Sequence, residues 1–455
     1  MELILLSGGS GKRLWPLSND ARSKQFLRLL ENKEGILESM VQRVWKQLAE
    51  AGLQDNTVIA TSKSQVDIIQ NQLGSHVPLI VEPERRDTFP AIALSAVYLY
   101  SVKGVSLHEV IGVLPVDPYV ETEFFQHLEV LEKSLLHSKA ELALIGIEPT
   151  YPSEKYGYIV PNTSKTNYFT VDYFKEKPSE EDAQVLINEE NARWNSGVFA
   201  FKLEYVINYL KQNGFPTTYD ELLHHYDRLP KISFDYEVVE QAKDVIAISY
   251  DGYWKDLGTW NTLTEEMGTE KIGKGMISHD SLNTHLVNEL DIPVTILGLS
   301  NIVVALSPDG LLVTDKQASP RLKNELKITQ RPMYEERRWG WYKVLDYTKY
   351  DGNEVLTKRL GILAGRNLSY QLHFKRSEVW TVVKGHGEFV MNGKMKKVRQ
   401  GDVLQIPVRS RHAIRAITDM EIIEVQSGSE LIEEDIKRIC LTWDEVTNLS
   451  SSAIS

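Results

Sequence analysis

The start of the chain constrains the fold more than any other stretch. A short apolar run over residues 3–6 leads into the glycine-rich sequence of residues 7–13. Three glycines within four positions let the backbone turn tightly and present N–H groups to an anion, while Lys12, Arg13 and Lys24 add positive charge. This pattern predicts a strand that ends in a phosphate-binding loop. A surface turn with incidental basic residues is the alternative, because the spacing matches neither the dinucleotide fingerprint nor the Gly-Lys-Ser/Thr phosphate loop.

Size and charge narrow the class of protein further. A chain of 455 residues exceeds the usual size of one hydrophobic core, so two or three domains are expected. Its 51 basic and 63 acidic side chains give a net charge of −12, which argues against nonspecific nucleic-acid binding and leaves anion binding to local pockets. The single cysteine, Cys440, excludes an internal disulfide. Without a leader or a long apolar span, we expect a cytoplasmic protein with no membrane segment.

Residues 1–265 alternate between apolar runs of strand length and stretches with helical periodicity. This alternation predicts an α/β fold, in which a mostly parallel sheet is covered by helices on both faces and binds ligands at the carboxyl ends of its strands. The expected strands cover residues 57–60, 78–81, 109–114 and 142–147, and the expected helices cover residues 37–51, 91–102 and 124–138.

The pattern changes after residue 265. Short strands separated by turns are expected at residues 272–276, 284–287, 294–297, 302–306 and 311–313. They predict a small β region over residues 266–330, which ends in a helix or linker at residues 320–330. Arg331-Pro332 marks a boundary, and residues 331–455 form a third domain that is dense in alternating strands.

A family resemblance gives these patterns a function. Residues 8–17, together with Lys24-Gln25-Phe26, resemble the signature of the sugar-1-phosphate nucleotidylyltransferases. The variant Leu14-Trp15-Pro16-Leu17 is most similar to that of the mannose-1-phosphate guanylyltransferases. The resemblance implies a Rossmann-like nucleotidyltransferase domain that binds GTP and mannose 1-phosphate and forms GDP-mannose and pyrophosphate. It also implies that Arg13 and Lys24 offset phosphate charge as catalytic residues, and that the nucleotide is cradled by Gly8, Gly9, Ser10 and Gly11.

The sequence from Glu82 to Ala91 resembles the family segment that lies beside the base and ribose. The resemblance makes Glu82, Arg86 and Thr88 candidates for nucleotide binding, although Asp87 stands where Asn is commoner in the family. Helix capping by Asp87 or Thr88 is a compatible structural role, because such side chains accept hydrogen bonds from the first free N–H groups of a helix.

Two aspartates match the metal-binding positions of the family. Asp117 ends the apolar run 113–116, and Asp256 lies within the sequence Trp254-Lys255-Asp256-Leu257-Gly258. A lone Asp at a strand end is usually a turn or cap residue. As a pair, however, the two carboxylates suit Mg²⁺, which takes one or two carboxylates and fills its shell with phosphate oxygens and water.

The sugar phosphate needs hydrogen-bond acceptors, amides and a cation. The resemblance implies this role for Gly157, Glu176, Lys177 and Asn195, which occur in the family's order and are flanked by aromatic residues. Solvated strand edges are the structural alternative for this stretch. Asp235 is either a sugar-site residue or a helix cap.

Two stretches of the C-terminal third, Arg338-Trp339-Gly340-Trp341-Tyr342 and Glu424-Val425-Gln426-Ser427-Gly428, carry a second resemblance. Through them the region from about residue 337 to residue 439 resembles the cupin barrel of bifunctional mannose-6-phosphate isomerase/guanylyltransferases. Gln371 and His373 would point to the same side of one strand, and the barrel interior could add Glu378 and His412 to a divalent metal site, with zinc favoured. Two ordinary histidines are the alternative. Isomerase activity is left open, because Phe374 and Lys375 replace the family's histidine-rich stretch; Arg411 or Arg415 would lie near the phosphate.

Transfer of GMP to mannose 1-phosphate is therefore the leading expectation for this chain. The alternatives are a bifunctional enzyme that also isomerises mannose 6-phosphate, a transferase for another pair of nucleotide and sugar 1-phosphate, and a non-catalytic regulatory subunit. The family also implies a homodimer that binds neither nucleic acid nor membrane.

Overall fold

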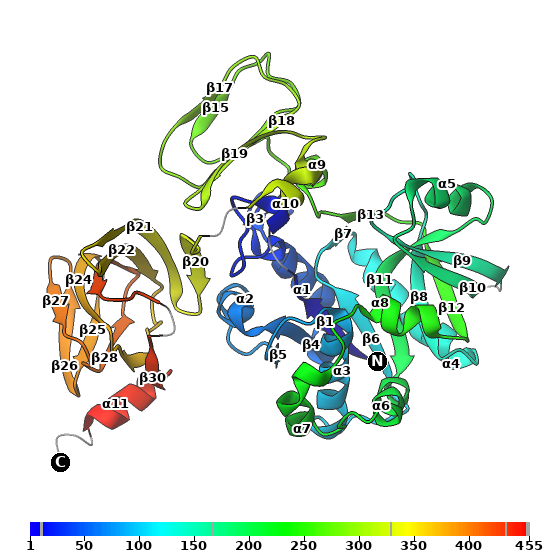
Figure 1. Ribbon diagram of the computed structural model, residues 1–455, viewed down its shortest axis with the longest axis horizontal. Coiled ribbons are helices and arrows are strands. Elements are labelled where there is room, and N and C mark those ends of the chain that lie inside the picture. Colours follow the sequence, from blue (N-terminus) through cyan, green and yellow to red (C-terminus); the bar gives the residue numbers. More distant parts are fainter. Residues whose placement is uncertain (10–11, 165–166, 328–329, 433–434, 452–455) are drawn as a thin grey trace.

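A nine-stranded sheet organises the first part of the chain in the computed structural model (Figure 1). The structure describes residues 1–9, 12–164, 167–327, 330–432 and 435–451. The strand order is β5-β4-β1-β6-β11-β8-β12-β10-β9. The strands are β1 (Glu2–Ser7), β4 (Thr57–Ser62), β5 (Leu79–Glu82), β6 (Val110–Pro115), β8 (Leu142–Ile147), β9 (Gly157–Ser164), β10 (Phe169–Glu176), β11 (Arg193–Lys202) and β12 (Val245–Tyr250).

The sheet is mostly parallel, as predicted, and the four expected strands are β4, β5, β6 and β8. Among the described strands of this sheet, only β10 and β11 run against the other seven. Strands β4 and β8 are both buried along their whole length. The sequence of β8 is accordingly a continuous apolar run rather than an alternating one, whereas β4 also buries Thr57, Thr61 and Ser62.

Helices cover both faces of the sheet. One face packs against α3 (Thr88–Ser101) and α6 (Leu203–Gln212), and the other against α1 (Met40–Glu50), α2 (Val66–Leu73) and α4 (His127–His137). The remaining helices of this part are α5 (Glu180–Asn188), α7 (Tyr219–His224), α8 (Phe234–Glu237) and α9 (Trp260–Glu266).

Helix starts differ from the predictions for local reasons. The helix expected from residue 37 begins at Met40, because Leu37–Glu38 forms β3, paired with β2 (Leu30–Glu31), and Ser39 then closes a capping box with Gln42. Helix α3 begins three residues before the predicted start because Asp87 is its N-cap and accepts a hydrogen bond from the N–H of Thr88. The predicted cap role of Asp87 is confirmed.

The predicted small β region is present, and it stacks β14 (Lys271–Ile272), β16 (His285–Asn288) and β18 (Ile302–Ser307) in parallel. Strand β19 (Gly310–Asp315) pairs with β18, and β15 (Gly275–Ile277) pairs with β17 (Val294–Ile296). Helix α10 (Leu322–Glu325) follows. The core of the small β region is continuous with residues that follow the glycine loop, because Leu14, Trp260 and Val303 belong to one buried cluster.

The last part of the chain is a barrel of two facing sheets, as expected for a cupin (Figure 1). Trp380 and Phe389 pack between the sheets, and α11 (Trp443–Ser451) follows them. None of the described helices is long and apolar enough to cross a membrane. One sheet contains β20 (Tyr334–Arg337), β21 (Gly340–Tyr350), β22 (Asn353–Ile362), β29 (Met420–Gly428), β24 (Arg376–Lys384) and β27 (Val403–Ile406); the other contains β26 (Lys394–Arg399), β25 (His386–Met391), β28 (His412–Ala416), β23 (Tyr370–Leu372) and β30 (Lys437–Cys440).

Candidate active site and cupin metal centre

A short pair of strands brings the two predicted metal ligands together. Asp117 follows β6 after one intervening residue, Val116, and the next residues form β7 (Pro118–Val120). Strand β13 (Trp254–Asp256) pairs antiparallel with β7, with Asp256 opposite Pro118. Asp117 and Asp256 therefore lie side by side at the carboxyl end of β6, where ligands are expected to bind in a sheet of this kind.

Lys24 joins this pair. Its Nζ lies 2.9 Å from Asp117 Oδ2 and 3.0 Å from Asp256 Oδ1. Burial alone would lower the pKa of Lys24, but the two carboxylates outweigh burial and raise it, so the ammonium stays charged at neutral pH. Burial alone would raise the pKa of Asp117, but the charge and hydrogen bond of Lys24 hold it below its ordinary value. The two carboxylates thus converge on one ammonium group.

The glycine loop is tied to the segment that carries Lys24. Ser23 Oγ donates a hydrogen bond to the carbonyl oxygen of Gly9 at 2.9 Å, and the side-chain amide of Gln25 donates to that of Gly8 at 3.4 Å. Gly9 has φ +118°, a backbone conformation that glycine adopts without strain. Ser10 and Gly11, also predicted here, lie outside the described residues. Gly8 and Gly9 are exposed at the end of β1, beside Lys24.

A cavity of about 180 Å³ opens beside the aspartate pair and is lined by Gly157, Glu176 and Asn195 together with Asp117 and Asp256. The structure therefore gathers most of the predicted sugar-site residues at the predicted metal pair. Space favours glycine at position 157, because a Cβ there would clash with Phe174 Cζ and lie 2.5 Å from Glu176 Oε2. Glu176 Oε1 accepts an ion-paired hydrogen bond from Lys177.

Asp235 lines the same cavity. Its Oδ1 accepts a hydrogen bond from Asn195 Nδ2 at 2.8 Å. Burial, followed by the negative charge of Glu176, raises the pKa of Asp235 to about 7. The predicted alternative role as a helix cap is wrong, because the N-cap of α8 is Ser233, whose side chain accepts from the N–H of Tyr236.

A second cavity, of about 270 Å³, shares Asp256 with the first and gathers positive charge. Its lining includes the predicted residues Arg13 and Lys177. It also includes two lysines that the sequence did not single out, Lys155 and Lys323. Clustered cations in a protein of net charge −12 make this the place where a polyphosphate would be attracted.

The three residues predicted to lie near the base and ribose are placed at the end of β5 and the start of α3, at the same edge of the sheet. Each contacts one segment, residues 226–234. Glu82 accepts a 2.7 Å hydrogen bond from the Tyr226 hydroxyl, and burial raises the pKa of Glu82. Arg86 Nη1 donates to the carbonyl of Leu229 at 3.0 Å, and Thr88 Oγ1 accepts from the N–H of Phe234 at 2.8 Å. Their role in nucleotide binding stays a prediction.

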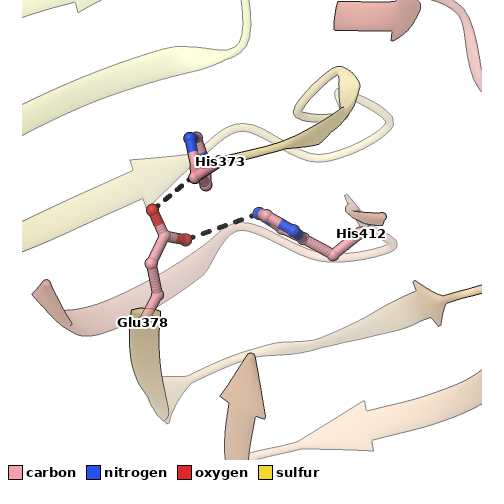
Figure 2. Close-up of side chains that lie close together, drawn as sticks. All are labelled: His373, Glu378 and His412. Carbon is pink, nitrogen blue, oxygen red and sulfur yellow. Dashed lines mark ion pairs between the residues drawn. The ribbon is translucent and has the colours of Figure 1, made fainter. Parts of the chain in front are cut away.

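The barrel contains a buried cluster of potential metal ligands. Figure 2 shows the Glu378 carboxylate, from β24, between the rings of His373 and His412. Glu378 Oε1 lies 3.2 Å from His373 Nε2, and Oε2 lies 3.4 Å from His412 Nε2. Burial lowers the pKa of His373, which favours the neutral imidazole that binds metals. His373 Nδ1 contacts the carbonyl oxygen of Asp435 at 2.6 Å, so Nε2 is left to face Glu378.

Two atoms of the cluster are unsatisfied. Within the described part of the chain, Glu378 Oε2 and His412 Nε2 are buried without a hydrogen-bond partner, although native proteins rarely leave such groups unpaired. This donor set of two imidazoles and one carboxylate suits a divalent cation such as zinc. The predicted ligand Gln371 is also present, with Nε2 3.3 Å from His373 Nε2 and Oε1 accepting from Ser369.

Sequence reasoning missed the charged groups around this cluster. Arg376 Nε donates to Glu378 Oε1 at 3.0 Å and covers that side of the carboxylate. Glu424 accepts from Trp380 Nε1 at 3.0 Å, and its pKa is raised to about 7, first by burial and then by the charge of Glu378. Alternation along β29 could have indicated that Glu424 and Gln426 share the face that points inward.

Comparison with known proteins follows the same division of the chain. The family model "Nucleotidyl transferase" matches residues 2–271, and the model "Mannose-6-phosphate isomerase C-terminal" matches residues 324–440. The mannose-1-phosphate guanylyltransferase of Salmonella montevideo is 29% identical over 96% of this chain and 98% of its own length. The alginate biosynthesis protein AlgA of Pseudomonas aeruginosa is 30% identical over 96% of this chain and 95% of its own. The solved structure of mannose-1-phosphate geranyltransferase from Thermus thermophilus is 27% identical, with a TM-score of 0.57, and covers 71% of this chain and 97% of that one.

Proposed function

This chain belongs to the nucleotidyl transferase family, and we propose that it transfers GMP from GTP to mannose 1-phosphate, giving GDP-mannose and pyrophosphate. The observation that carries the proposal is that Lys24, Asp117 and Asp256 converge beside a cavity. The cavity is lined by carboxylate and amide side chains that can bind sugar hydroxyls. The proposal is supported by two cavities that share Asp256, because their linings bring together predicted residues from distant parts of the sequence, among them Arg13, Lys177 and Asn195.

The reaction joins two anions. An oxygen of the mannose 1-phosphate group attacks the α-phosphorus of GTP in line; a new P–O bond forms as the bond to the departing pyrophosphate breaks. Catalysis therefore depends on positioning and on neutralising charge. The ammonium of Lys24 neutralises charge on the reacting phosphates. Arg13 binds the triphosphate from the second cavity, and Lys177 binds the sugar phosphate.

The aspartate pair fits Mg²⁺. Both carboxylates already converge on one cationic atom, Lys24 Nζ, and an all-oxygen donor set is the kind that Mg²⁺ prefers. Asp117 and Asp256 would hold the ion, which supplies charge neutralisation at phosphate oxygens when bound. Gly8 and Gly9 present the loop to the nucleotide, with Glu82, Arg86 and Thr88 assigned to the base and ribose. Glu176, Asn195 and Asp235 hold sugar hydroxyls, since they offer acceptors and an amide in the first cavity.

Isomerisation of mannose 6-phosphate and fructose 6-phosphate in the barrel is a second candidate function. It is favoured by the buried cluster of His373, Glu378 and His412, in which two ligand atoms have no hydrogen-bond partner within the described residues. These residues, with Gln371 beside them, would hold a divalent metal, with Zn²⁺ favoured. Such a metal polarises carbonyl groups as a Lewis acid. Arg376 places further positive charge next to the site.

One pair of assays on the full chain tests both functions. Pyrophosphate release is followed with Mg²⁺, GTP and mannose 1-phosphate, and isomerisation is followed on the same sample. Release that requires both substrates and is lost in Asp256→Asn supports the transferase. Isomerisation that is lost in His373→Ala, while transfer is kept, supports the second function. Activity only with another nucleotide or sugar phosphate in a substrate panel contradicts the proposed specificity, and inactivity across the panel favours a regulatory subunit.

The family resemblance also leads us to propose a cytoplasmic homodimer. Sedimentation of the purified chain tests the oligomeric state, and a mass equal to that of a single chain contradicts it.

A further inference from the structure

One glutamate of the C-terminal part is buried against the segment of the N-terminal part that carries Lys24. Glu336 lies on β20, the strand that precedes β21 and packs on α2. Its side chain is 3% exposed. Its Oε1 accepts a hydrogen bond from Arg28 Nη1 at 3.1 Å, and its Oε2 lies 3.0 Å from Arg28 Nη2. Gln72 Nε2 also donates to Oε2, at 3.2 Å.

The same carboxylate faces a second arginine. Arg22 Nε lies 3.7 Å from Glu336 Oε1, and the guanidinium stacks over the ring of Tyr334 at 5.0 Å. Arg22 also pairs in bidentate fashion with Glu289 of the β region, with both N–O distances at 2.9 Å. Bidentate arginine–carboxylate pairs fix orientation as well as charge. Arg22 therefore joins all three parts of the chain.

Lys24 lies between these two arginines in the sequence. The segment from Arg22 to Arg28 is held at both ends by Glu336, while its middle is bonded to the carbonyls of Gly8 and Gly9. Two arginines and two glutamates neutralise one another in this cluster. Arg22 and Glu336 are its buried members, so removing the charge of Glu336 would leave the buried Arg22 with less compensation. The segment that carries Lys24 is thus ion-paired at Arg22 and Arg28 with a carboxylate from beyond residue 330.

We propose that Glu336 is a positioning residue for nucleotidyl transfer: through Arg22 and Arg28 it fixes the segment that carries Lys24. The inference rests on the proposed function for its kinetic readout. It gives the barrel a part in the transfer reaction whether or not the barrel has chemistry of its own.

Docking of the two parts as such is a separate effect, and the interface offers a matched control. Arg337, the neighbour of Glu336 on β20, pairs with Asp67 of α2 at 3.4 Å, and Asn71 donates to the Arg337 carbonyl at 2.8 Å. These contacts join the same two elements without touching the segment that carries Lys24. Asp67→Asn therefore weakens the interface and leaves the contacts of Glu336 with Arg22 and Arg28 in place.

The test compares Glu336→Gln and Asp67→Asn in the full chain, with GTP, mannose 1-phosphate and Mg²⁺. We expect kcat of Glu336→Gln to fall by at least about tenfold with little change in the KM for GTP, because small displacements of a catalytic group cost large factors in rate. Asp67→Asn should keep a kcat near that of the wild type. A kcat within about twofold of wild type in Glu336→Gln, or an equal loss in both variants, overturns the inference.

A second measurement needs no substrate. Hydrogen–deuterium exchange, read by mass spectrometry, should be faster in peptides covering residues 19–28 in Glu336→Gln than in wild type, and unchanged in peptides from β6. Unchanged exchange over residues 19–28 overturns the inference. A wild-type protein without transfer activity would refute the proposed function alone. The exchange measurement would still show whether Glu336 fixes the segment from Arg22 to Arg28. If Glu336→Gln does not fold, Arg28→Gln, which leaves Arg22 beside Glu336, takes its place under the same criteria.

Discussion

Replacing Asp235 by Asn should change how the stability of the protein depends on pH. The folded structure raises the pKa of Asp235 from 3.8 to about 7, mainly through burial and then through the charge of Glu176. A folded pKa above the unfolded value means that the folded state binds the proton more tightly. The stabilisation from this proton is complete below pH 3.8 and is lost as the pH rises through about 7.

The size of the effect follows from the shift. One pKa unit corresponds to about 1.4 kcal/mol, so a shift of roughly three units disfavours the ionised folded state by up to about 4 kcal/mol above pH 7. Asn cannot ionise, and its side-chain oxygen can still accept the hydrogen bond from Asn195. Asp235→Asn should therefore unfold at a temperature several degrees above wild type at pH 8.5, and at nearly the same temperature at pH 4.5.

Differential scanning calorimetry at both pH values, at fixed ionic strength, measures this difference. Asp172→Asn is the control, because Asp172 is exposed on β10, and it should shift neither curve. If wild type and Asp235→Asn differ by the same amount at pH 4.5 and pH 8.5, the reasoning from burial and from Glu176 is refuted.

Three further predictions concern the other sites. Lys24→Met removes the cation between Asp117 and Asp256, so calorimetry without nucleotide should find Mg²⁺ bound at least about tenfold more tightly, since a unit charge about 4 Å away is worth a few kcal/mol at an effective dielectric of about 20. Turnover should collapse in the same variant, and an unchanged Mg²⁺ affinity would contradict this account. Gly157→Ala pushes a methyl group against Glu176 Oε2 and should raise the KM for mannose 1-phosphate by at least about tenfold while sparing the KM for GTP; equal changes in both would sink its role in the sugar site. Glu378→Gln should lose zinc on dialysis, as metal analysis would detect, and keep transfer activity; retained zinc would exclude Glu378 as a ligand.

The sequence predicts well those parts of the structure that have a regular hydrophobic pattern or a long motif. The buried strand β8 is a continuous apolar run, and the glycine loop after β1 has a long, irregular motif. Strand direction carries no such signal, which is why the reversed strands β10 and β11 could not be seen. The family expected from residues 8–17 is confirmed by the match over residues 2–271.

Proximity was the harder inference at the active site. Asp117 and Asp256 meet through strands of three residues, which are too short to show periodicity. Lys323 lines the second cavity from α10, outside the predicted first domain, and no local pattern marks it. By contrast, the cap role of Asp87 was readable from residue type alone. The roles of Glu82, Arg86 and Thr88 rest on resemblance, because their described contacts are to residues 226–234 and to neighbouring residues.

The pairing of β7 with β13 also sets the earliest time at which the two aspartates can come together while the protein is being made. Translation runs from the amino terminus, and domains fold as their segments emerge from the ribosome. A growing chain that ends before β13 contains β1, β4 and β6, but only one of the two aspartates. Lys24 then has half of its partners, and the cation site has a single carboxylate. A nascent chain therefore lacks the site with two carboxylates until Trp254–Asp256 has been synthesised and has paired with β7.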